Sequence, residues 1–142
     1  MYSQLRRELV HDYIAMESQH DKISEMMVRL DAMIKGNQHN YTSIIIALDE
    51  LKSYLDGHLS HEERLMMMMK YPLVTEHKNH HKSLRRELDF QRGKFHGADT
   101  RPCGDLIAFI GRWLEVHEQD HDSPLKRFLM RSLGQIGSDV RH

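Results

Sequence analysis

The stretch from Ile44 to Met69, IIIALDELKSYLDGHLSHEERLMMMM, carries the pattern that decides the fold. Steps of four and three residues in alternation meet apolar side chains along it, apart from a histidine and a glutamate. Apolar residues at this spacing form the inward face of a helix in a bundle. The stretch therefore predicts a long helix with a mostly apolar buried stripe. That stripe consists of Ile44, Leu48, Leu51, Leu55, His58, Glu62, Leu65 and Met69.

Three further segments carry stripes with the same spacing, from His20 to Ile34, from Val74 to Leu88 and from Leu106 to His117. No stretch alternates apolar and polar residues as a half-buried strand does. The connections between the stripes are short, which makes consecutive helices antiparallel. The sequence therefore predicts an all-α fold, an up-down-up-down antiparallel four-helix bundle.

Turn-forming residues separate the predicted helices at positions 36–40, at Tyr71-Pro72 and at positions 93–102. Ser123-Pro124 marks a late break or kink. A chain of 142 residues has the length of one domain, so we expect a single domain over residues 1–142.

Both ends of the chain extend beyond the four stripes. Residues 1 to about 16 precede the first stripe, and we expect an N-terminal arm or an extra turn there. Residues from about 124 to 142 carry a short stripe, which predicts a short C-terminal helix or tail. This basic segment could contact a membrane or an unknown protein partner, but docking onto its own bundle is the favoured interpretation. The short stripe consists of Leu125, Phe128, Leu129, Leu133 and Ile136.

The composition argues against several classes of function. The 20 lysines and arginines nearly balance the 21 aspartates and glutamates, so no basic excess indicates nucleic-acid binding. The longest apolar runs, Ile44 to Leu48 and Leu65 to Met69, are too short to span a membrane. The N-terminal residues lack the apolar core of a secretory signal, and the lone Cys103 fits a reducing compartment. We therefore expect a cytoplasmic protein that binds neither nucleic acid nor a membrane.

Polar residues on the buried stripes are the most informative feature of the sequence. The chain has 12 histidines, and five of them, with one glutamate, lie on the stripes of the four predicted helices. A buried charge or an unpaired imidazole is costly unless something compensates for it. A metal site in the centre of a bundle satisfies all these groups at once. With a nearby aspartate, the candidate ligands are His20, His58, Glu62, His77, His81, His117 and Asp122.

The spacing within each helix supports a shared site. His58 and Glu62 are four residues apart, so both point the same way, and the same spacing lets the two histidines of the third helix chelate one ion. His117 and Asp122 are five residues apart, about 140° around an ideal helix. That pair needs a locally loosened turn, or an aspartate that reaches back from an irregular helix end beside Pro124.

The types of side chain narrow the choice of metal. Imidazole and carboxylate ligands suit iron, zinc or manganese, and no thiolate set indicates a structural zinc site. Seven side chains exceed what one tetrahedral ion can use. Two ions bridged by the two carboxylates can use them all and leave one position open for a small ligand.

At this point the residues resemble a known family, the bacterial hemerythrins. The resemblance covers residues from about 15 to 125, with every candidate ligand at the spacing of the family. It implies a non-haem di-iron centre, oxo- or hydroxo-bridged, that binds O2 reversibly. The motifs are Ser18-Gln19-His20-Asp21-Lys22, His58-Leu-Ser-His-Glu62-Glu63, Tyr71-Pro72 before His77-Lys-Asn-His-His81, and Trp113-Leu114-Glu-Val-His117 before Asp122.

The resemblance also implies a role for each ligand. Three histidines would hold one iron and two the other, with the carboxylates as bridges, and O2 would bind at the iron that carries two histidines. The first iron would be held by His77, His81 and His117, the second by His20 and His58, and the bridges would be Glu62 and Asp122.

Three residues depart from the pattern of the family. Leu59 stands where a phenylalanine is common, Glu118 where an apolar residue is usual, and Glu17 where an aspartate is frequent. None of them removes a ligand. The first two bear on the ligand pocket and its access to solvent.

Two other metal motifs share some of these residues. His117-Glu118-Gln119-Asp120-His121 matches the H-E-x-x-H helix of zinc proteases, but a third ligand is missing and we expect His121 to face solvent. Glu17 with His20 and Glu118 with His121 form two E-x-x-H pairs, as in ferritin-like di-iron proteins, with Glu62 and Glu76 as further carboxylates. That scheme leaves four histidines of the stripes unexplained. We expect the remaining histidines to be solvated: His11, His39, His61, His80, His96 and His142.

Three classes of function remain open for a di-iron centre. The favoured one is O2 binding for carriage, storage, delivery or sensing, without enzymatic turnover. No proton-relay residue stands out beyond the ligands, which disfavours an enzyme acting on peroxide or nitric oxide. A sensor would need a separate protein partner, for which the basic C-terminal stripe is the candidate surface.

Overall fold

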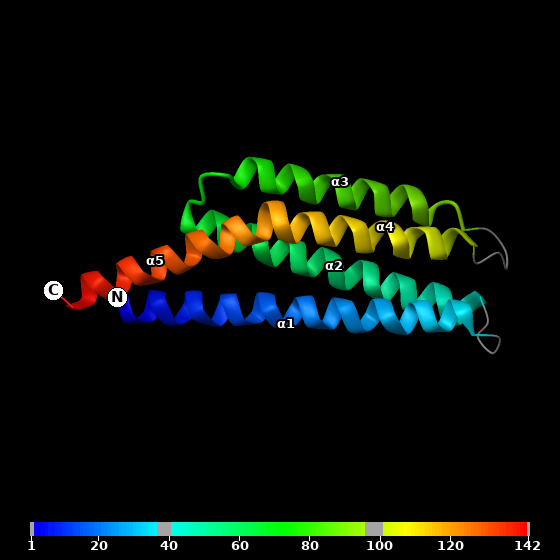
Figure 1. Cartoon of the computed structure of the whole chain (residues 1–142), viewed down its shortest axis with the longest axis horizontal. Helices are drawn as coiled ribbons and strands as arrows, with labels where there is room; N and C mark the ends of the chain where they lie inside the picture. The colour runs from blue at the N-terminus through cyan, green and yellow to red at the C-terminus, as the bar shows by residue number, and fades with distance from the viewer. Residues whose placement is uncertain (1, 37–40, 96–100, 142) are drawn as a thin grey trace.

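The computed structural model describes residues 2–36, 41–95 and 101–141, and within these ranges it contains helices and no strand (Figure 1). No helix in the described ranges is both long enough and apolar enough to cross a membrane. In chain order the elements are α1 (Tyr2–Lys35), α2 (Tyr41–Met69), α3 (Val74–Arg92), α4 (Arg101–His117), the π-helical turn η1 (Glu118–Asp122) and α5 (Ser123–Arg141).

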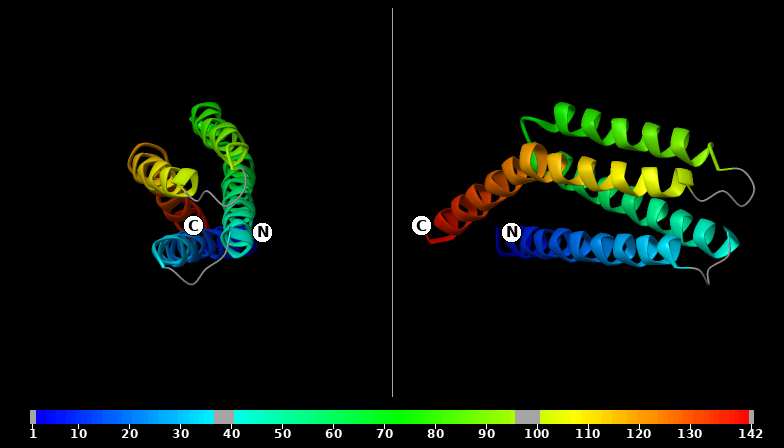
Figure 2. Two further views of the ribbon diagram at one scale, coloured as in Figure 1. Left: turned by 90° about the vertical axis from the view of Figure 1, so that its right-hand side faces the viewer. Right: turned by 45° about the vertical axis from the view of Figure 1, so that its right-hand side comes forward.

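The first four helices form a ring in which each contacts two neighbours. α1 contacts α2, α2 contacts α3, α3 contacts α4, and α4 contacts α1. Consecutive helices run in opposite directions in Figure 1, and the end-on view of Figure 2 shows their four axes around a common centre. The predicted all-α, up-down-up-down four-helix bundle is confirmed.

The core of the bundle has two apolar clusters. The larger one fills the space between α1, α2, α3 and α4 and includes Leu51, Leu55 and Leu84, all fully buried. The smaller one lies toward the other end of α2, with Leu65 and Met66 as its α2 members. Glu62 falls between these two sets along α2, and His58 lies directly before Leu59, the last α2 member of the larger cluster, so the bundle places a polar layer where the two apolar clusters meet.

The N-terminal residues correct one expectation. The expected arm, residues 1 to about 16, is from Tyr2 onward the beginning of α1, a continuous helix of 34 residues. Leu9 and Met16 are buried in the smaller apolar cluster, together with Leu125 and Leu129 of α5. This end of α1 packs on α5 and on the end of α2, partners that the local periodicity of the first segment does not reveal.

The C-terminal segment continues directly from α4. Through the π-helical turn η1 it leads into α5, a helix of 19 residues that contacts α1 and runs toward its N-terminal end in Figure 2. The expected break at Ser123-Pro124 is a change of direction within continuous helical backbone. Pro124 lies in the first turn of α5, a position in which proline is tolerated. The side chain of Ile136, the last member of the predicted stripe, lies outside the described residues.

Only one of the predicted connections lies wholly within the described residues. It is the break at Tyr71-Pro72, between the end of α2 and the start of α3 at Val74. Positions 37–40 of the first expected turn and 96–100 of the third lie outside those residues, while Pro102 belongs to α4.

The confirmed connection is closed by a C-cap. Lys70 has a φ of 54°, in the left-handed region. Its amide donates to the carbonyl of Met67 at 3.3 Å, and the amide of Tyr71 donates to that of Met66 at 3.0 Å. This is the Schellman pattern, in which glycine is the usual residue because a Cβ in this conformation costs about 1–2 kcal/mol.

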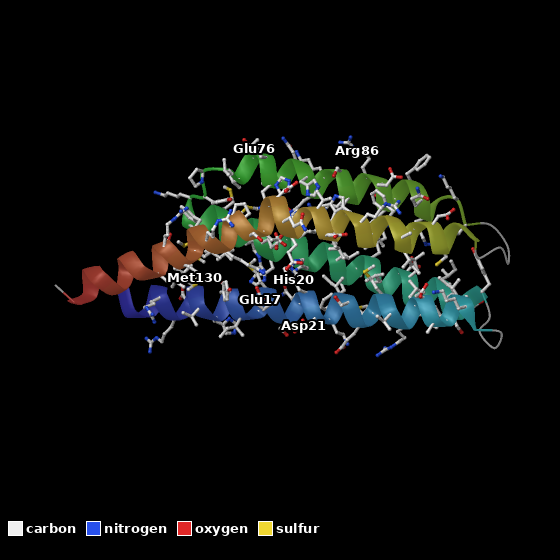
Figure 3. The ribbon with its side chains drawn as sticks, viewed as in Figure 1. Glu17, His20, Asp21, Glu76, Arg86 and Met130 are labelled. Carbon is white, nitrogen blue, oxygen red and sulfur yellow. The ribbon has the colours of Figure 1, made fainter. Side chains whose placement is uncertain are left out.

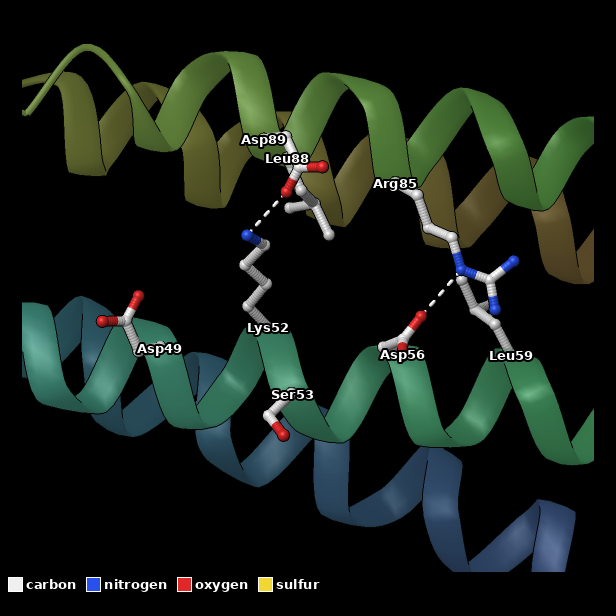
Figure 4. A pocket seen from close by; sticks show the side chains of 8 residues that line it. All are labelled: Asp49, Lys52, Ser53, Asp56, Leu59, Arg85, Leu88 and Asp89. Carbon is white, nitrogen blue, oxygen red and sulfur yellow. Dashed lines mark hydrogen bonds and ion pairs between the residues drawn. The ribbon is translucent and has the colours of Figure 1, made fainter.

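Ion pairs join the outer faces of α2 and α3 (Figure 4). Lys52 lies 2.6 Å from Asp89, and Arg85 lies 2.7 Å from Asp56. These groups line a shallow pocket of about 490 Å³ over buried Leu59. Such solvent-accessible pairs contribute about 0–1 kcal/mol each, so they favour one register of the two helices more than they stabilise the fold.

Candidate metal centre

All seven candidate ligands lie in the polar layer between the two apolar clusters. α1 supplies one of them, α2 and α3 supply two each, α4 supplies its last residue and η1 its last residue. In Figure 3, His20 lies on the inner side of α1, whereas Asp21 projects outward. Six of the seven are at most 2% exposed, and His20 is half-buried. The six are His58, Glu62, His77, His81, His117 and Asp122.

One group of donor atoms gathers around Glu62. Its Oε1 lies 3.0 Å from Nε2 of His81, 3.3 Å from Nε2 of His117 and 3.4 Å from Nε2 of His77. One ligand atom of each of these four residues lies within 4.8 Å of every other, a separation that suits one metal ion. We call these residues the three-histidine group.

A second group shares the same glutamate. Oε2 of Glu62 lies 3.3 Å from Nε2 of His58 and 3.9 Å from Nε2 of His20. Asp122 completes this group through its Oδ2, which lies 3.2 Å from Nε2 of His20. These four residues also offer ligand atoms within 4.8 Å of one another, and we call them the two-histidine group.

Each carboxylate spans both groups. Glu62 directs one oxygen to each of them. Asp122 does the same, since its Oδ1 lies 2.9 Å from Nε2 of His117 and 3.3 Å from Nε2 of His77. Two buried carboxylates therefore lie between two sets of imidazole nitrogens, the arrangement that two bridged ions need.

The π-helical turn explains how His117 and Asp122 reach one site. In α4 and η1 the backbone passes from α-helical to π-helical, with the amide of Ser123 bonded to the carbonyl of Glu118. A π-helical turn bonds residues five apart instead of four and so takes in one extra residue, which brings the side chains at 117 and 122 to the same face. Of the two alternatives for this pair, the structure shows the locally loosened turn.

The buried polar atoms fit a cation. Among the described residues, the buried atoms that lack a well-aligned hydrogen bond include Nε2 of His58, Oε2 of Glu62 and Oδ1 of Asp122. A buried polar atom without a partner costs about 1–3 kcal/mol. All three atoms face the inside of the cluster, where a metal ion would satisfy them.

The electrostatics of the cluster also favour positive charge. Burial raises the pKa of Glu62, but the close imidazoles of His117, His58 and other histidines outweigh it and hold this pKa well below its usual range. Burial lowers the pKa of His117, but the close carboxylates of Asp122 and Glu62 raise it to about 9. The carboxylates thus attract either a proton or a metal ion to the same imidazole nitrogen, so metal binding at these histidines is expected to release protons.

Comparison with known proteins agrees with this geometry. The family model described as the hemerythrin HHE cation binding domain matches residues 11–129. The chain belongs to this family. The resemblance found in the sequence motifs is thereby confirmed.

Curated relatives within the hemerythrin family are distant in sequence. Bacteriohemerythrins of Pseudomonas aeruginosa and Pseudomonas paraeruginosa are each 27% identical to this chain over 124 residues. The aligned part covers 87% of this hemerythrin-family chain and 78% of each relative. No solved structure gives a significant match.

Three histidines of this hemerythrin-family site are held from outside the cluster. Nδ1 of His58 lies 2.8 Å from Oε1 of Gln19. Nδ1 of His81 lies 2.8 Å from Oε2 of Glu63, which also accepts a hydrogen bond from Arg85 at 2.8 Å. Such outer partners fix the orientation and the tautomer of an imidazole ligand.

The third outer partner is His80, which the sequence assigned to solvent. Its Nδ1 lies 2.7 Å from Nδ1 of His117. Burial, together with the nearby imidazoles of His117 and His121, lowers the pKa of His80 to about 4, so this ring is neutral at physiological pH. Periodicity could not identify it, because it lies outside the stripe and meets His117 only through the packing of α3 on α4.

Two further histidines differ from the expectation of full solvation. His61 is half-buried, with its Nδ1 3.2 Å from Oε1 of Gln19 and its Nε2 3.4 Å from Oδ1 of Asp12. His121 is half-buried too, and its ring stacks on that of His80 with a centroid distance of 4.2 Å.

The two competing metal motifs find no support in the described residues. His121 belongs to neither group of candidate ligands, and it lies in a π-helical turn instead of the α-helix of an H-E-x-x-H site. Glu17 is bound to Lys126 at 2.6 Å outside the cluster. Glu76 projects from the outer face of α3 (Figure 3), and Glu118 is exposed.

Proposed function

We propose that this chain binds O2 reversibly at a centre of two non-haem iron ions. The observation that carries the proposal is the pair of carboxylates that each direct one oxygen to both groups of imidazoles. A site for a single ion would not need two carboxylates that each reach two separate groups of imidazoles. Nitrogen and carboxylate donors without thiolates suit iron, and membership of the hemerythrin family supports a cation in this place.

The ligand assignment follows the two groups. His77, His81 and His117 would hold one ion, and His20 and His58 would hold the other. Glu62 and Asp122 would bridge them. A pair of neighbouring ferrous ions supplies the electrons that reversible O2 binding requires.

A small cavity supports a small ligand. It has a volume of about 60 Å³ and reaches the two-histidine group at His20 and Asp122. Ile23 and Leu114 contribute apolar surface to its lining, and exposed Glu118 also borders it. This space suits a diatomic molecule and is too small for a peptide. The two-histidine group is therefore the side from which O2 would reach the centre.

The proposal is tested by iron content combined with visible spectroscopy. The anaerobically reduced protein is expected to hold two irons per chain. It should develop a charge-transfer band on addition of O2 and lose it under argon over repeated cycles. Two irons that oxidise without a reversible band would contradict O2 binding and favour an enzyme acting on peroxide or nitric oxide.

A matched variant keeps the test specific. His121 lies next to Asp122 but is not a member of either ligand group. His121→Ala should therefore retain two irons, whereas His117→Ala should lose iron from the three-histidine group. Equal loss of iron in both variants would contradict the ligand assignment.

A further inference from the structure

The outer contacts of the three held histidines differ in chemistry. Gln19 offers an amide oxygen and Glu63 a carboxylate oxygen, so both are acceptors at the atom that faces the ligand. His80 offers a ring nitrogen, which either donates or accepts according to its tautomer. In the contact between His80 and His117, one ring nitrogen must therefore donate and the other must accept.

The position of the ring proton of His117 decides which of the two rings donates. A nitrogen that binds a metal must carry no proton. Nε2 of His117 faces the cluster, 2.9 Å from Oδ1 of Asp122, so its Nδ1 is left to carry the ring proton. Nδ1 of His80, 2.7 Å away, must then accept, with its own proton on Nε2.

The ring of His80 stacks on two aromatic neighbours besides its contact with His117. Its centroid lies 4.4 Å from that of Trp113, with the planes 9° apart, and 4.2 Å from that of His121, with the planes 18° apart. Trp113 also stacks on His117 at 4.4 Å. The hydroxyl of Ser83 accepts from the Trp113 indole N–H at 3.2 Å and donates to the His80 carbonyl at 2.6 Å.

We propose that His80 is a positioning residue of the metal centre, which accepts a hydrogen bond from His117 and thereby holds Nε2 of His117 free to bind a metal ion. The inference rests on the proposed assignment of His117 as a ligand. It requires only that a metal ion binds in the three-histidine group. It does not depend on that ion being iron or on O2 binding at the centre.

Three variants separate the hydrogen bond from the stack. His80→Phe keeps a flat ring between Trp113 and His121 but removes the acceptor. His80→Gln returns an acceptor without the ring. His121→Phe is the matched control, since it makes the same exchange at the neighbour that does not contact Nδ1 of His117.

The first readout is the affinity for Zn²⁺, measured by competition with a chelator. Loss of an outer partner of a metal-binding histidine weakens affinity about 10- to 100-fold. We expect this loss in His80→Phe, and less than about threefold change in His80→Gln and in His121→Phe. Equal affinity in His80→Phe and the native chain would overturn the inference, as would an equal loss in His121→Phe.

The second readout is nitrogen NMR of the histidine rings in the native chain loaded with Zn²⁺, which does not depend on the folding of a variant. The expected spectrum shows His117 protonated at Nδ1 and His80 protonated at Nε2. A proton on Nδ1 of His80 would overturn the inference. Failure of the O2 cycle with these tautomers in place would instead contradict the proposed function alone.

Discussion

Glu62→Gln should weaken the binding of both metal ions, because a single residue serves both groups. Oε1 of Glu62 lies 3.0 Å from the nearest imidazole of the three-histidine group, and Oε2 lies 3.3 Å from that of His58 in the two-histidine group. Glutamine keeps the volume of the side chain and removes its charge. A hydrogen bond to a charged group is worth about 1.5–3 kcal/mol. If each ion loses an interaction of this size, both dissociation constants rise about ten- to hundredfold.

The assay is anaerobic titration of the apo-protein with Fe²⁺ against a chelator, analysed as two binding steps. The matched control is Glu63→Gln, an adjacent glutamate that contacts His81 at Nδ1 and Arg85 but not the interior of the cluster. This control should weaken only one step. A Glu62→Gln variant in which one of the two steps is unchanged would refute the assignment of Glu62 as a bridge.

Three further predictions concern other parts of the chain. Lys70→Gly should raise stability by about 0.5–1 kcal/mol in urea denaturation, because it relieves the cost of φ 54° at the C-cap, while Lys70→Ala should give no such gain. Cys103 is buried, and burial raises the pKa of its thiol to about 11, so the folded protein at pH 8 should resist iodoacetamide until it is unfolded. Labelling of the native chain at the rate of the unfolded chain would contradict this. Glu118→Gln should speed the binding of azide to the iron-loaded protein about two- to fivefold at low ionic strength, since the carboxylate borders the cavity at His20. Azide rates that are equal in the two proteins, or a difference that persists in high salt, would exclude a charge effect.

The buried stripes made the fold and the candidate ligands predictable from the sequence. Polar residues on an apolar stripe must have partners inside the bundle, so the positions of His58 and Glu62 in the sequence are enough to predict a polar site there. The interval of five residues between His117 and Asp122 left two alternatives, a loosened turn or an aspartate that reaches back from an irregular helix end, and the structure shows the first of them as η1.

Contacts that depend on how helices pack were not predictable in this way. Leu9 and Met16 of α1 are buried against α5 and the end of α2, and no local pattern of residues 1–16 identifies these partners. His80 directly precedes His81, so on an ideal helix it points about 100° away from the ligand stripe. Only the approach of α4 to α3 brings it to Nδ1 of His117.

The π-helical turn acts as a phase shift in the heptad pattern of the last helix. Before it, the buried positions of α4 end at His117, and after it they resume at Asp122 and continue through Leu125 and Leu129. If residues 118–122 were regular α-helix instead, every later buried residue would be rotated by about 100° relative to α4, the angle of one residue. The alignment of His117 with Asp122 and the docking of α5 on α1 therefore depend on the same π-helical turn, and neither can be changed without the other.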